Sequence, residues 1–204
     1  NDSAIEGSET IISNASCTTN NAAPMIDLIK RHFGIKQAYI TTVHSYTTDQ
    51  SLHDQPHRDL RRARAAGQSI VPTTTGAAKA LTKIFSDLSD VIGGCGIRVP
   101  VANGSLTDIT INVEKDTTIE EVNEIFKIAA QSELKGILEY TEDPIVSIDI
   151  VGNSHSCVFD AQMTSVIGNM VKIVGWYDNE TGYSSRILDL ICNLSDKKAL
   201  LSNK

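Results

Sequence analysis

Cys17 lies in a setting that is unusual for a structural cysteine, among the small polar residues of "SNASCTTN". Structural cysteines usually pack with apolar side chains, where they act as small hydrophobic groups. Apolar residues then recur at helical spacing up to Phe33, and Gly34 is a typical stop, so the pattern predicts a helix that begins near Cys17. The partial positive charge of the unpaired N–H groups there favours a thiolate and lowers the thiol pKa. We therefore interpret Cys17 as a nucleophile whose helix end could also bind an oxyanion.

A base for this thiol is found 27 residues later, at His44. The β-branched run "KQAYITTVHS" predicts a strand over residues 36–45 that ends near this histidine. Strand ends commonly present side chains to a cleft, and a cysteine beside a histidine makes an activated nucleophile. The spacing alone is equally compatible with a buried cysteine and an unrelated, hydrogen-bonded histidine.

A cluster of arginines suggests that the ligand is an anion. The segment "HRDLRRARAA" places Arg58, Arg61, Arg62 and Arg64 close together in a chain that is acidic overall. Such a run is usually a solvated face or a partner for acidic side chains. Here it precedes "TTTGAAKAL", where hydroxyls and free N–H groups at a helix start could bind phosphate. Arg98 could add a bidentate contact, so a phosphorylated small molecule is the expected ligand.

The elements that must position these residues follow from the rest of the pattern. Residues 46–72 form a long polar segment without periodicity, and connections of that length within a domain are more often functional than not. We predict helices over 76–88, over 117–131 with a capping box from Thr117 to Glu120, and over about 178–194. We predict strands over 104–113, 145–151 and 156–161. A hairpin is predicted over 161–178, with its turn at Gly168-Asn169. This pattern predicts an α+β fold, with a predominantly antiparallel mixed sheet and helices on one face.

Composition narrows the class of protein further. The 204 residues include 18 basic and 25 acidic side chains, which disfavours a broad nucleic-acid surface. No apolar run approaches the roughly 20 residues of a membrane helix, so we expect no membrane partner. The four cysteines lack the spacing of a zinc site or a disulfide framework, so we expect no metal and a reduced, cytoplasmic location. The chain starts at Asn1 without a signal-peptide pattern, and we expect it to be a piece of a longer polypeptide.

Six segments taken together carry a family resemblance. In chain order they are "SNASCTTN", "TTVHSYTTDQ", "HRDLRRARAA", "PTTTGAAKA", "RVP" and "WYDNETGYS". The same segments occur in this order and spacing in glyceraldehyde-3-phosphate dehydrogenases. The sequence resembles that family over nearly its whole length, from about Ser8 to Asn193.

The resemblance implies a reaction. Cys17 would attack the aldehyde of D-glyceraldehyde 3-phosphate to give a hemithioacetal. His44 would activate the thiol and assist hydride departure to NAD. Inorganic phosphate would then resolve the thioester and yield 1,3-bisphosphoglycerate.

The resemblance also implies binding roles. The residues around the attacking phosphate would be Ser16, Thr18, Arg62, Thr75 and Gly76, and those around the substrate's own phosphate would be Thr47, Asp49 and Arg98. Asn179 would contact the nicotinamide amide, with Tyr183 near it. The implied cofactor is NAD, with NADP possible, and the implied assembly is a homotetramer that buries the other face of the sheet.

The family's dinucleotide-binding half has no counterpart in this sequence. The "GGCGIR" segment lacks a third glycine and a following helix, so it is not a dinucleotide fingerprint. The resemblance therefore implies a single catalytic domain over 1–204 that includes the C-terminal helix. The N-terminal dinucleotide-binding domain lies outside it. We expect this chain alone to bind NAD poorly and to turn over negligibly.

Two alternatives remain at this point. Erythrose-4-phosphate dehydrogenase shares the thiol chemistry but hydrolyses the thioester, and it tends to lose the "SYT" and "TGAAKA" segments that are intact here. A non-catalytic binding or scaffolding module would keep the fold without the reaction. Intact Cys17, His44 and Arg98 disfavour that second alternative.

Overall fold

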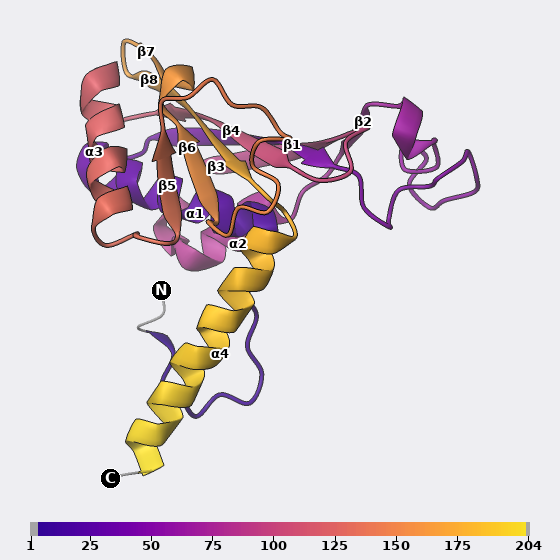
Figure 1. Cartoon of the computed structure of the whole chain (residues 1–204). Helices are drawn as coiled ribbons and strands as arrows, with labels where there is room; N and C mark the ends of the chain where they lie inside the picture. Colours follow the sequence, from indigo (N-terminus) through magenta and orange to yellow (C-terminus); the bar gives the residue numbers. More distant parts are fainter. Residues whose placement is uncertain (1–3, 203–204) are drawn as a thin grey trace.

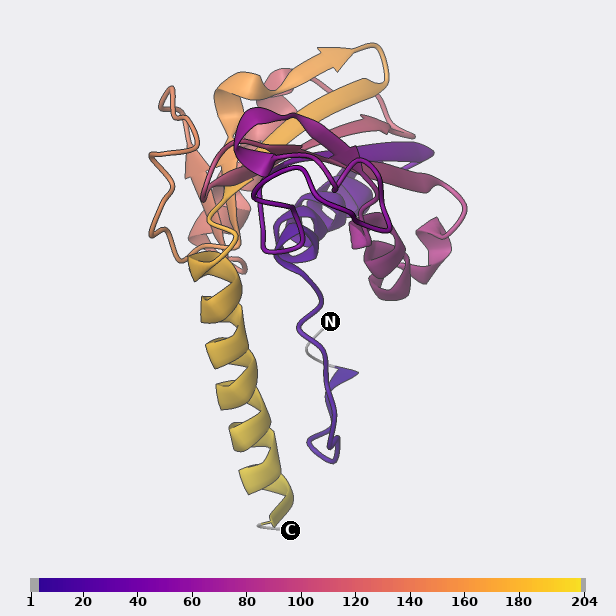
Figure 2. The same ribbon diagram turned by 90° about the vertical axis from the view of Figure 1, so that its right-hand side faces the viewer.

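A computed structural model describes residues 4–202 of the chain (Figures 1 and 2). Within those residues, four α-helices and eight strands follow one another. They are α1 (Cys17–Phe33), β1 (Gln37–Ser45), β2 (Val71–Thr73), α2 (Ala77–Ile84), β3 (Ile92–Val99), β4 (Ser105–Asn112), α3 (Ile119–Gln131), β5 (Leu138–Thr141), β6 (Cys157–Asp160), β7 (Ser165–Ile167), β8 (Met170–Tyr177) and α4 (Thr181–Ser202). Short 3-10 turns lie at Ala66–Gln68, Ser86–Leu88 and Ala161–Met163.

The strands form one mixed sheet. Their order is β2-β3-β1-β4-β8-β6-β5, and β7 pairs with β8 outside this path. β1 is parallel to β3 and β5 to β6, while the other five pairings are antiparallel. The predicted α+β fold with a predominantly antiparallel mixed sheet is confirmed. The predicted hairpin is also confirmed, because Gly168-Asn169 joins β7 to β8 and Gly168 has a φ of 59° that suits glycine.

Three helices cover one face of the sheet, as predicted. α1 contacts β4, β6 and β8, α2 contacts β3, α3 contacts β5, and α1 touches both other helices. Figure 1 shows α1 and α2 lying together on the same side of the sheet. The fully buried core between these layers includes Met25, Ile26, Ile29, Ile40, Ile109, Phe126 and Ile173. Burial of each such side chain contributes roughly 1.5–3 kcal/mol to stability.

The opposite face of the sheet is only partly covered. Along β4, residues alternate between buried and half-buried from Ser105 to Asn112. In β1, Ile40 faces the core and is fully buried, while its neighbour Tyr39 is 53% exposed on the other face. Successive strand residues point to opposite faces, so this alternation defines a core face and a second, half-exposed face.

Two sequence-based element predictions were wrong in position or type. The capping box lies one residue later than predicted, at Thr118 and Glu121. Residues 145–151 form no strand, and consecutive turns run over 147–152 instead. One cause is local, because the Asp149 carboxylate accepts a hydrogen bond from the Val146 N–H at 2.8 Å and holds a turn.

The two helices that flank the site also differ in length from the prediction. The predicted helix over 76–88 ends at Ile84, and a separate 3-10 turn follows Phe85. The last helix begins at Thr181 and continues to Ser202, beyond the predicted end at residue 194. Within residues 4–202, no helix combines the length and the apolar character that a bilayer span needs.

α4 extends away from the sheet, and the N-terminal segment runs beside it (Figures 1 and 2). Asn14 Nδ2 donates to the Tyr183 carbonyl at 3.5 Å, and Lys197 Nζ donates to the Ile5 carbonyl at 2.7 Å. Leu188 and Ile191 on this helix are 64% and 56% exposed. The helix therefore keeps an apolar face that the described residues do not bury.

The long segment between β1 and β2 is irregular, as predicted, and projects from the sheet in Figure 1. Backbone hydrogen bonds fold it onto itself, from the Ser51 N–H to the Arg62 carbonyl at 3.3 Å and from the Ala66 N–H to the Ser51 carbonyl at 2.9 Å. These bonds bring the arginine cluster back toward the end of β1.

Candidate active site

Cys17 and His44 meet although 27 residues separate them. Cys17 is the first residue of α1, and Ser16 caps that helix by accepting the Thr19 N–H at 3.1 Å. His44 is the penultimate residue of β1. The sulfur of Cys17 lies 3.4 Å from His44 Nε2, within hydrogen-bond reach. The sequence left this pairing open, and the fold provides it.

Burial controls the protonation of both partners. Desolvation raises the pKa of the Cys17 thiol, and this effect exceeds the lowering by the Thr18 N–H and hydroxyl. Desolvation, with a further contribution from the Arg98 charge, lowers the pKa of His44 to about 4. The sequence-based expectation of a lowered thiol pKa was therefore wrong in sign. At neutral pH the pair is a thiol beside a neutral imidazole.

Arg98 lies on the other side of the His44 ring. β1 and β3 are parallel neighbours, and their register places Arg98 directly beside His44. Arg98 Nη1 lies 2.7 Å from His44 Nδ1 and donates to the Ser45 carbonyl at 2.9 Å. The same carbonyl lies 2.8 Å from His44 Nδ1. The His44 ring thus lies between the thiol and a guanidinium.

The thiol and the imidazole open into a cavity of about 440 Å³. The predicted site residues that line it are Ser16, Cys17, Thr18, His44, Arg62, Thr75, Gly76 and Arg98. The positive side chains and the hydroxyls are suited to a phosphate group. Thr47, Asp49, Asn179 and Tyr183 are not among the lining residues.

Arg62 is fixed by its neighbours. Its Nη2 and Nε donate to the Thr73 hydroxyl at 2.6 and 3.1 Å. Its Nη1 forms a salt bridge with the Asp49 carboxylate, and its Nε lies 3.4 Å from Asp59. Asp49 therefore contacts an arginine of the cavity without lining the cavity itself. Thr73 was not predicted as a site residue, because it is the first of three consecutive threonines and nothing in the sequence distinguishes its contact from those of the other two.

Thr47 is held by a buried glutamine that was not among the predicted site residues. Gln50 Oε1 accepts hydrogen bonds from the Thr47 N–H at 2.8 Å and from its hydroxyl at 3.0 Å. Gln50 is only 6% exposed, which is unusual for an amide side chain in an irregular segment. A glutamine at i+3 from a threonine was the available signal for this contact.

The start of α2 forms the opposite wall of the cavity. The Thr75 hydroxyl accepts the Ala77 N–H at 3.2 Å, and Gly76 precedes the first helical residue. A Cβ at Gly76 would meet no atom within 4 Å, so this stretch of backbone is open. The predicted helix start at this Thr/Gly stretch is confirmed.

Asn179 lies where β1, β4 and the start of α4 converge. Its Oδ1 accepts the hydroxyls of Ser45 at 2.9 Å and Ser105 at 2.8 Å. Two donors on the oxygen fix the orientation of the amide and leave Nδ2 as its donor group. This donor suits a carboxamide oxygen such as that of nicotinamide. Tyr183 is half-buried two residues into α4.

Tyr177 contacts His44 and the residue that follows Cys17. Its buried hydroxyl lies 2.8 Å from each of the Thr18 and Thr42 hydroxyls. Its ring meets the His44 ring edge-on, with centroids 5.8 Å apart. Burial raises its pKa, so it remains neutral. No pattern in the sequence singled out this residue.

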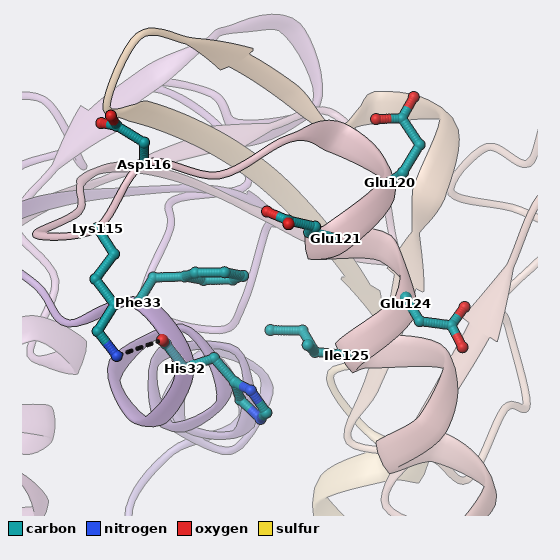
Figure 3. A pocket seen from close by; sticks show the side chains of 8 residues that line it. All are labelled: His32, Phe33, Lys115, Asp116, Glu120, Glu121, Glu124 and Ile125. Carbon is teal, nitrogen blue, oxygen red and sulfur yellow. Dashed lines mark hydrogen bonds between the residues drawn. The ribbon is translucent and has the colours of Figure 1, made fainter.

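A second hollow, of about 650 Å³, lies at the other end of α1 (Figure 3). Glu120, Glu121 and Glu124 of α3 line it together with His32, Phe33, Lys115, Asp116 and Ile125. α1 has 17 residues, so at 1.5 Å per residue its ends lie roughly 25 Å apart. This acidic hollow is therefore remote from Cys17 and lacks a nucleophile.

Curated relatives share this sequence at high identity. A glyceraldehyde-3-phosphate dehydrogenase of Mycobacterium avium is 52% identical over 191 residues, which is 94% of this chain and 56% of that protein. Glyceraldehyde-3-phosphate dehydrogenase 2 of Streptomyces avermitilis is 56% identical over 181 residues, or 88% of this chain and 54% of that protein. Glyceraldehyde-3-phosphate dehydrogenase 1 of Bacillus cereus is 52% identical over 188 residues, or 92% and 56%. This chain thus spans about half the length of the curated relatives that it matches.

The family comparison covers the site described above. The family sequence model described as "Glyceraldehyde 3-phosphate dehydrogenase, C-terminal domain" matches residues 16–179 of this chain. This range contains Cys17, His44, both arginines of the cavity and Asn179, and it ends just before α4. The chain therefore belongs to the family of the glyceraldehyde-3-phosphate dehydrogenase C-terminal domain.

Proposed function

We propose that this chain carries the catalytic half of a phosphorylating aldehyde dehydrogenase. Its reaction converts D-glyceraldehyde 3-phosphate, NAD and inorganic phosphate into 1,3-bisphosphoglycerate and NADH. The observation that carries the proposal is the approach of the Cys17 sulfur to His44 Nε2 at 3.4 Å, in a cavity that Arg62 and Arg98 also line. A thiol beside a base adds to aldehydes, and guanidinium groups bind phosphate.

The chemistry assigned to the chain's own residues is proton transfer and covalent catalysis. As Cys17 attacks the aldehyde carbon, His44 takes the thiol proton and passes it to the carbonyl oxygen, which gives a hemithioacetal. His44 then takes the hydroxyl proton while the carbon loses a hydride and becomes a thioester. The nicotinamide cofactor, when bound, supplies the acceptor for that hydride. Inorganic phosphate attacks the thioester and expels the Cys17 thiolate.

Two anion subsites are proposed within the cavity and at its rim. Ser16, Thr18, Arg62, Thr75 and Gly76 would bind the attacking phosphate. The substrate's own phosphate would be bound by Arg98 and Thr47. The ion pair with Arg62 supports a different role for Asp49, which would hold that arginine in place without touching an anion. A carboxylate in direct contact with a phosphate would repel it.

The cofactor would be NAD, with NADP as the alternative, and its nicotinamide amide would bind at Asn179 beside Tyr183. The two hydroxyls on Asn179 Oδ1 support this role, because they leave Nδ2 to donate to the ligand. We assign the rest of the cofactor to a dinucleotide-binding domain outside these 204 residues. The length of the curated relatives supports that assignment, since this chain spans only about half of it.

The assembly proposed for the intact protein is a homotetramer in the cytoplasm. The half-exposed face of the sheet, with Tyr39 53% exposed, supports a subunit contact there. The projecting segment between β1 and β2 would reach a neighbouring subunit's cofactor site. All four cysteines are free, which supports a reducing compartment.

The test is an assay of NADH formation from D-glyceraldehyde 3-phosphate with and without inorganic phosphate, in the protein that includes its dinucleotide-binding domain. Strict phosphate dependence supports the proposal. Phosphate-independent oxidation of erythrose 4-phosphate would assign the protein to the hydrolytic sister enzyme. A Cys17 that reacts with iodoacetamide no faster than a model thiol would favour a non-catalytic module.

A further inference from the structure

Asp178 is a buried carboxylate that backbone N–H groups hold from two directions. It directly follows β8 and is 1% exposed. Its Oδ1 accepts the N–H groups of Glu180 and Thr181 at 2.8 and 2.9 Å and so caps the start of α4. Its Oδ2 accepts the Gly152 N–H at 2.7 Å, from the connection between β5 and β6, residues 142–156. One oxygen is enough for a helix cap, so the second oxygen links α4 to this connection.

The donors around Asp178 keep it ionised although it is buried. Desolvation opposes the charge, but the N–H groups of Gly152, Thr181 and Glu180 and the side chain of Asn103 outweigh it and hold the pKa of the carboxyl below its usual range. Hydrogen bonds to a charged acceptor are stronger than neutral ones. The bond from Gly152 is therefore a firm link between the connection and the start of α4.

The same connection also approaches the start of β4. Gly104 directly precedes Ser105 and has a φ of 94°, and a Cβ there would lie 2.3 Å from the Ser147 carbonyl oxygen. Only glycine permits this approach. In the first turn of α4, a Cβ at Gly182 would lie 2.7 Å from the His155 carbonyl oxygen. The connection, which runs beside the start of α4 in Figure 1, thus packs against β4 and α4 at once.

The connection is stiffened by its own hydrogen bonds. The Asp149 N–H donates to the Val146 carbonyl at 3.0 Å, and the Val146 N–H donates back to the Asp149 carboxylate at 2.8 Å. The Asn153 N–H donates to the Ile150 carbonyl at 3.0 Å, and Ile150 is only 2% exposed. A connection held in this way can fix the position of the elements that it contacts.

The two elements that it contacts meet at Asn179. The Ser105 hydroxyl donates to Asn179 Oδ1 at 2.8 Å, and this bond helps to orient the amide. Gly104 precedes Ser105 and Asp178 precedes Asn179, so the connection contacts the chain neighbour of each partner in this bond. Any shift of α4 against β4 would change the direction in which Asn179 Nδ2 points.

Accordingly, we propose that Asp178 is a positioning residue for the nicotinamide amide. Its Oδ2 links the start of α4 to the connection between β5 and β6, and this link holds Asn179 Nδ2 in the direction that a carboxamide oxygen requires. Asp178 acts through Asn179 and does not itself contact the cofactor. The inference rests on the proposed function, because it takes the nicotinamide amide as the ligand of Asn179.

Asp178→Asn separates the roles of the two oxygens, in the protein with its dinucleotide-binding domain. Asparagine still caps a helix through Oδ1, but its Nδ2 cannot accept the Gly152 N–H. Calorimetric titration should show NAD binding weakened about tenfold, the equivalent of about 1.4 kcal/mol, because Asn179 loses part of its fixed orientation. ADP-ribose, which lacks the nicotinamide, should bind as it does to the wild type. Asp178→Ser, which keeps a cap without adding a donor, should give the same result.

Asp160→Asn is the matched control. Asp160 is also buried, at 4% exposed, and one of its oxygens caps the 3-10 turn Ala161–Met163 by accepting the Gln162 N–H at 3.1 Å. Its other oxygen accepts Trp176 Nε1 at 3.0 Å. The substitution removes the same kind of second acceptor without touching Asn179. It should therefore leave the affinities for NAD and ADP-ribose unchanged.

Hydrogen exchange checks the link itself. In Asp178→Asn the Gly152 amide should exchange faster, while the Thr181 amide stays protected by the retained cap.

Unchanged NAD affinity in both Asp178 variants would overturn the proposal, as would an equal loss for NAD and ADP-ribose or the same loss in Asp160→Asn. A wild type that binds ADP-ribose as tightly as NAD would refute the nicotinamide role proposed for Asn179, and this inference with it. A wild type that prefers NAD, with variants that keep the same preference, would refute the positioning role of Asp178 alone.

Discussion

His44 Nε2 lies 3.4 Å from the sulfur of Cys17, and the two residues, one at a strand end and one at a helix start, line the same cavity. Both side chains are largely removed from water. Burial disfavours charge on each of them, so the resting pair is neutral. Reactivity of the thiol therefore depends on transfer of its proton to the imidazole.

Replacement of the base tests this dependence. His44→Asn should lower kcat/KM by roughly 10²- to 10⁴-fold, the usual contribution of a general base. The rate of Cys17 alkylation by iodoacetamide at neutral pH should also fall. His53→Asn is the control, because His53 is exposed in the segment between β1 and β2. Unchanged alkylation in His44→Asn would show that the imidazole does not activate the thiol.

The low pKa of His44 has a consequence for stability. Folding lowers this pKa from 6.5 to about 4, so below pH 6.5 the unfolded chain binds a proton that the folded protein excludes. The contribution of neutral His44 to the free energy of unfolding is therefore fully present above pH 6.5. It is lost as the pH falls toward 4, and the loss amounts to at most about 3 kcal/mol. Urea unfolding of wild type and His44→Asn should show a steeper loss in the wild type across this window. Parallel curves would exclude a buried neutral His44.

The contact between Asp49 and Arg62 predicts which substrate a substitution affects. Asp49→Asn should weaken the hold on Arg62 and raise the KM for inorganic phosphate about fivefold, which corresponds to about 1 kcal/mol for a half-exposed pair. The KM for the aldehyde should change little. Asp54→Asn is a matched control, since Asp54 pairs with Arg64 in the same segment. A selective rise in the aldehyde KM would instead place Asp49 at the substrate's phosphate.

The two hydroxyls on Asn179 predict a cofactor phenotype. Ser105→Ala removes one donor to Oδ1 and should weaken NAD binding about fivefold, the equivalent of about 1 kcal/mol for one hydrogen bond. Alkylation of Cys17 without cofactor should keep its rate. Ser184→Ala, at an exposed position of α4, should leave both quantities unchanged. Calorimetric titration in the protein with its dinucleotide-binding domain measures the effect, and wild-type affinity in Ser105→Ala would argue against the role of Asn179.

The 204-residue chain alone should bind NAD poorly, because it offers only the nicotinamide side of the proposed site. Its turnover of D-glyceraldehyde 3-phosphate should be negligible. Titration of NAD into the isolated chain checks this expectation. Micromolar affinity would mean that these residues hold the cofactor by themselves.

The local signals in the sequence were sufficient to predict most elements. The polar setting of Cys17 and the helical spacing after it predicted α1, and β-branched residues predicted β1. The hairpin at Gly168-Asn169 followed from turn chemistry. Each of these predictions depends on neighbours in the chain, and the structure confirms them.

The long-range contacts could not be read from the sequence. Arg98 reaches His44 because β3 pairs with β1 in parallel register, yet three of the eight residues of β3 are glycine, which is depleted in strands. The backbones approach closely there, since a Cβ at Gly94 would lie 2.8 Å from the Ile40 carbonyl oxygen. The net pKa of Cys17 likewise depends on burial, which local pattern does not reveal. Whether burial or the N–H groups of the helix start dominate the pKa of Cys17 is evident only from the folded structure.

The most direct test of the central claim is to observe the covalent intermediate on Cys17. The protein with its dinucleotide-binding domain is mixed with D-glyceraldehyde 3-phosphate and NAD without inorganic phosphate, and its intact mass is recorded with peptide mapping. We predict one acyl adduct on Cys17 that disappears when inorganic phosphate is added, with release of the acyl phosphate. An absent adduct, or one that persists after phosphate is added while NADH still forms, would contradict the account.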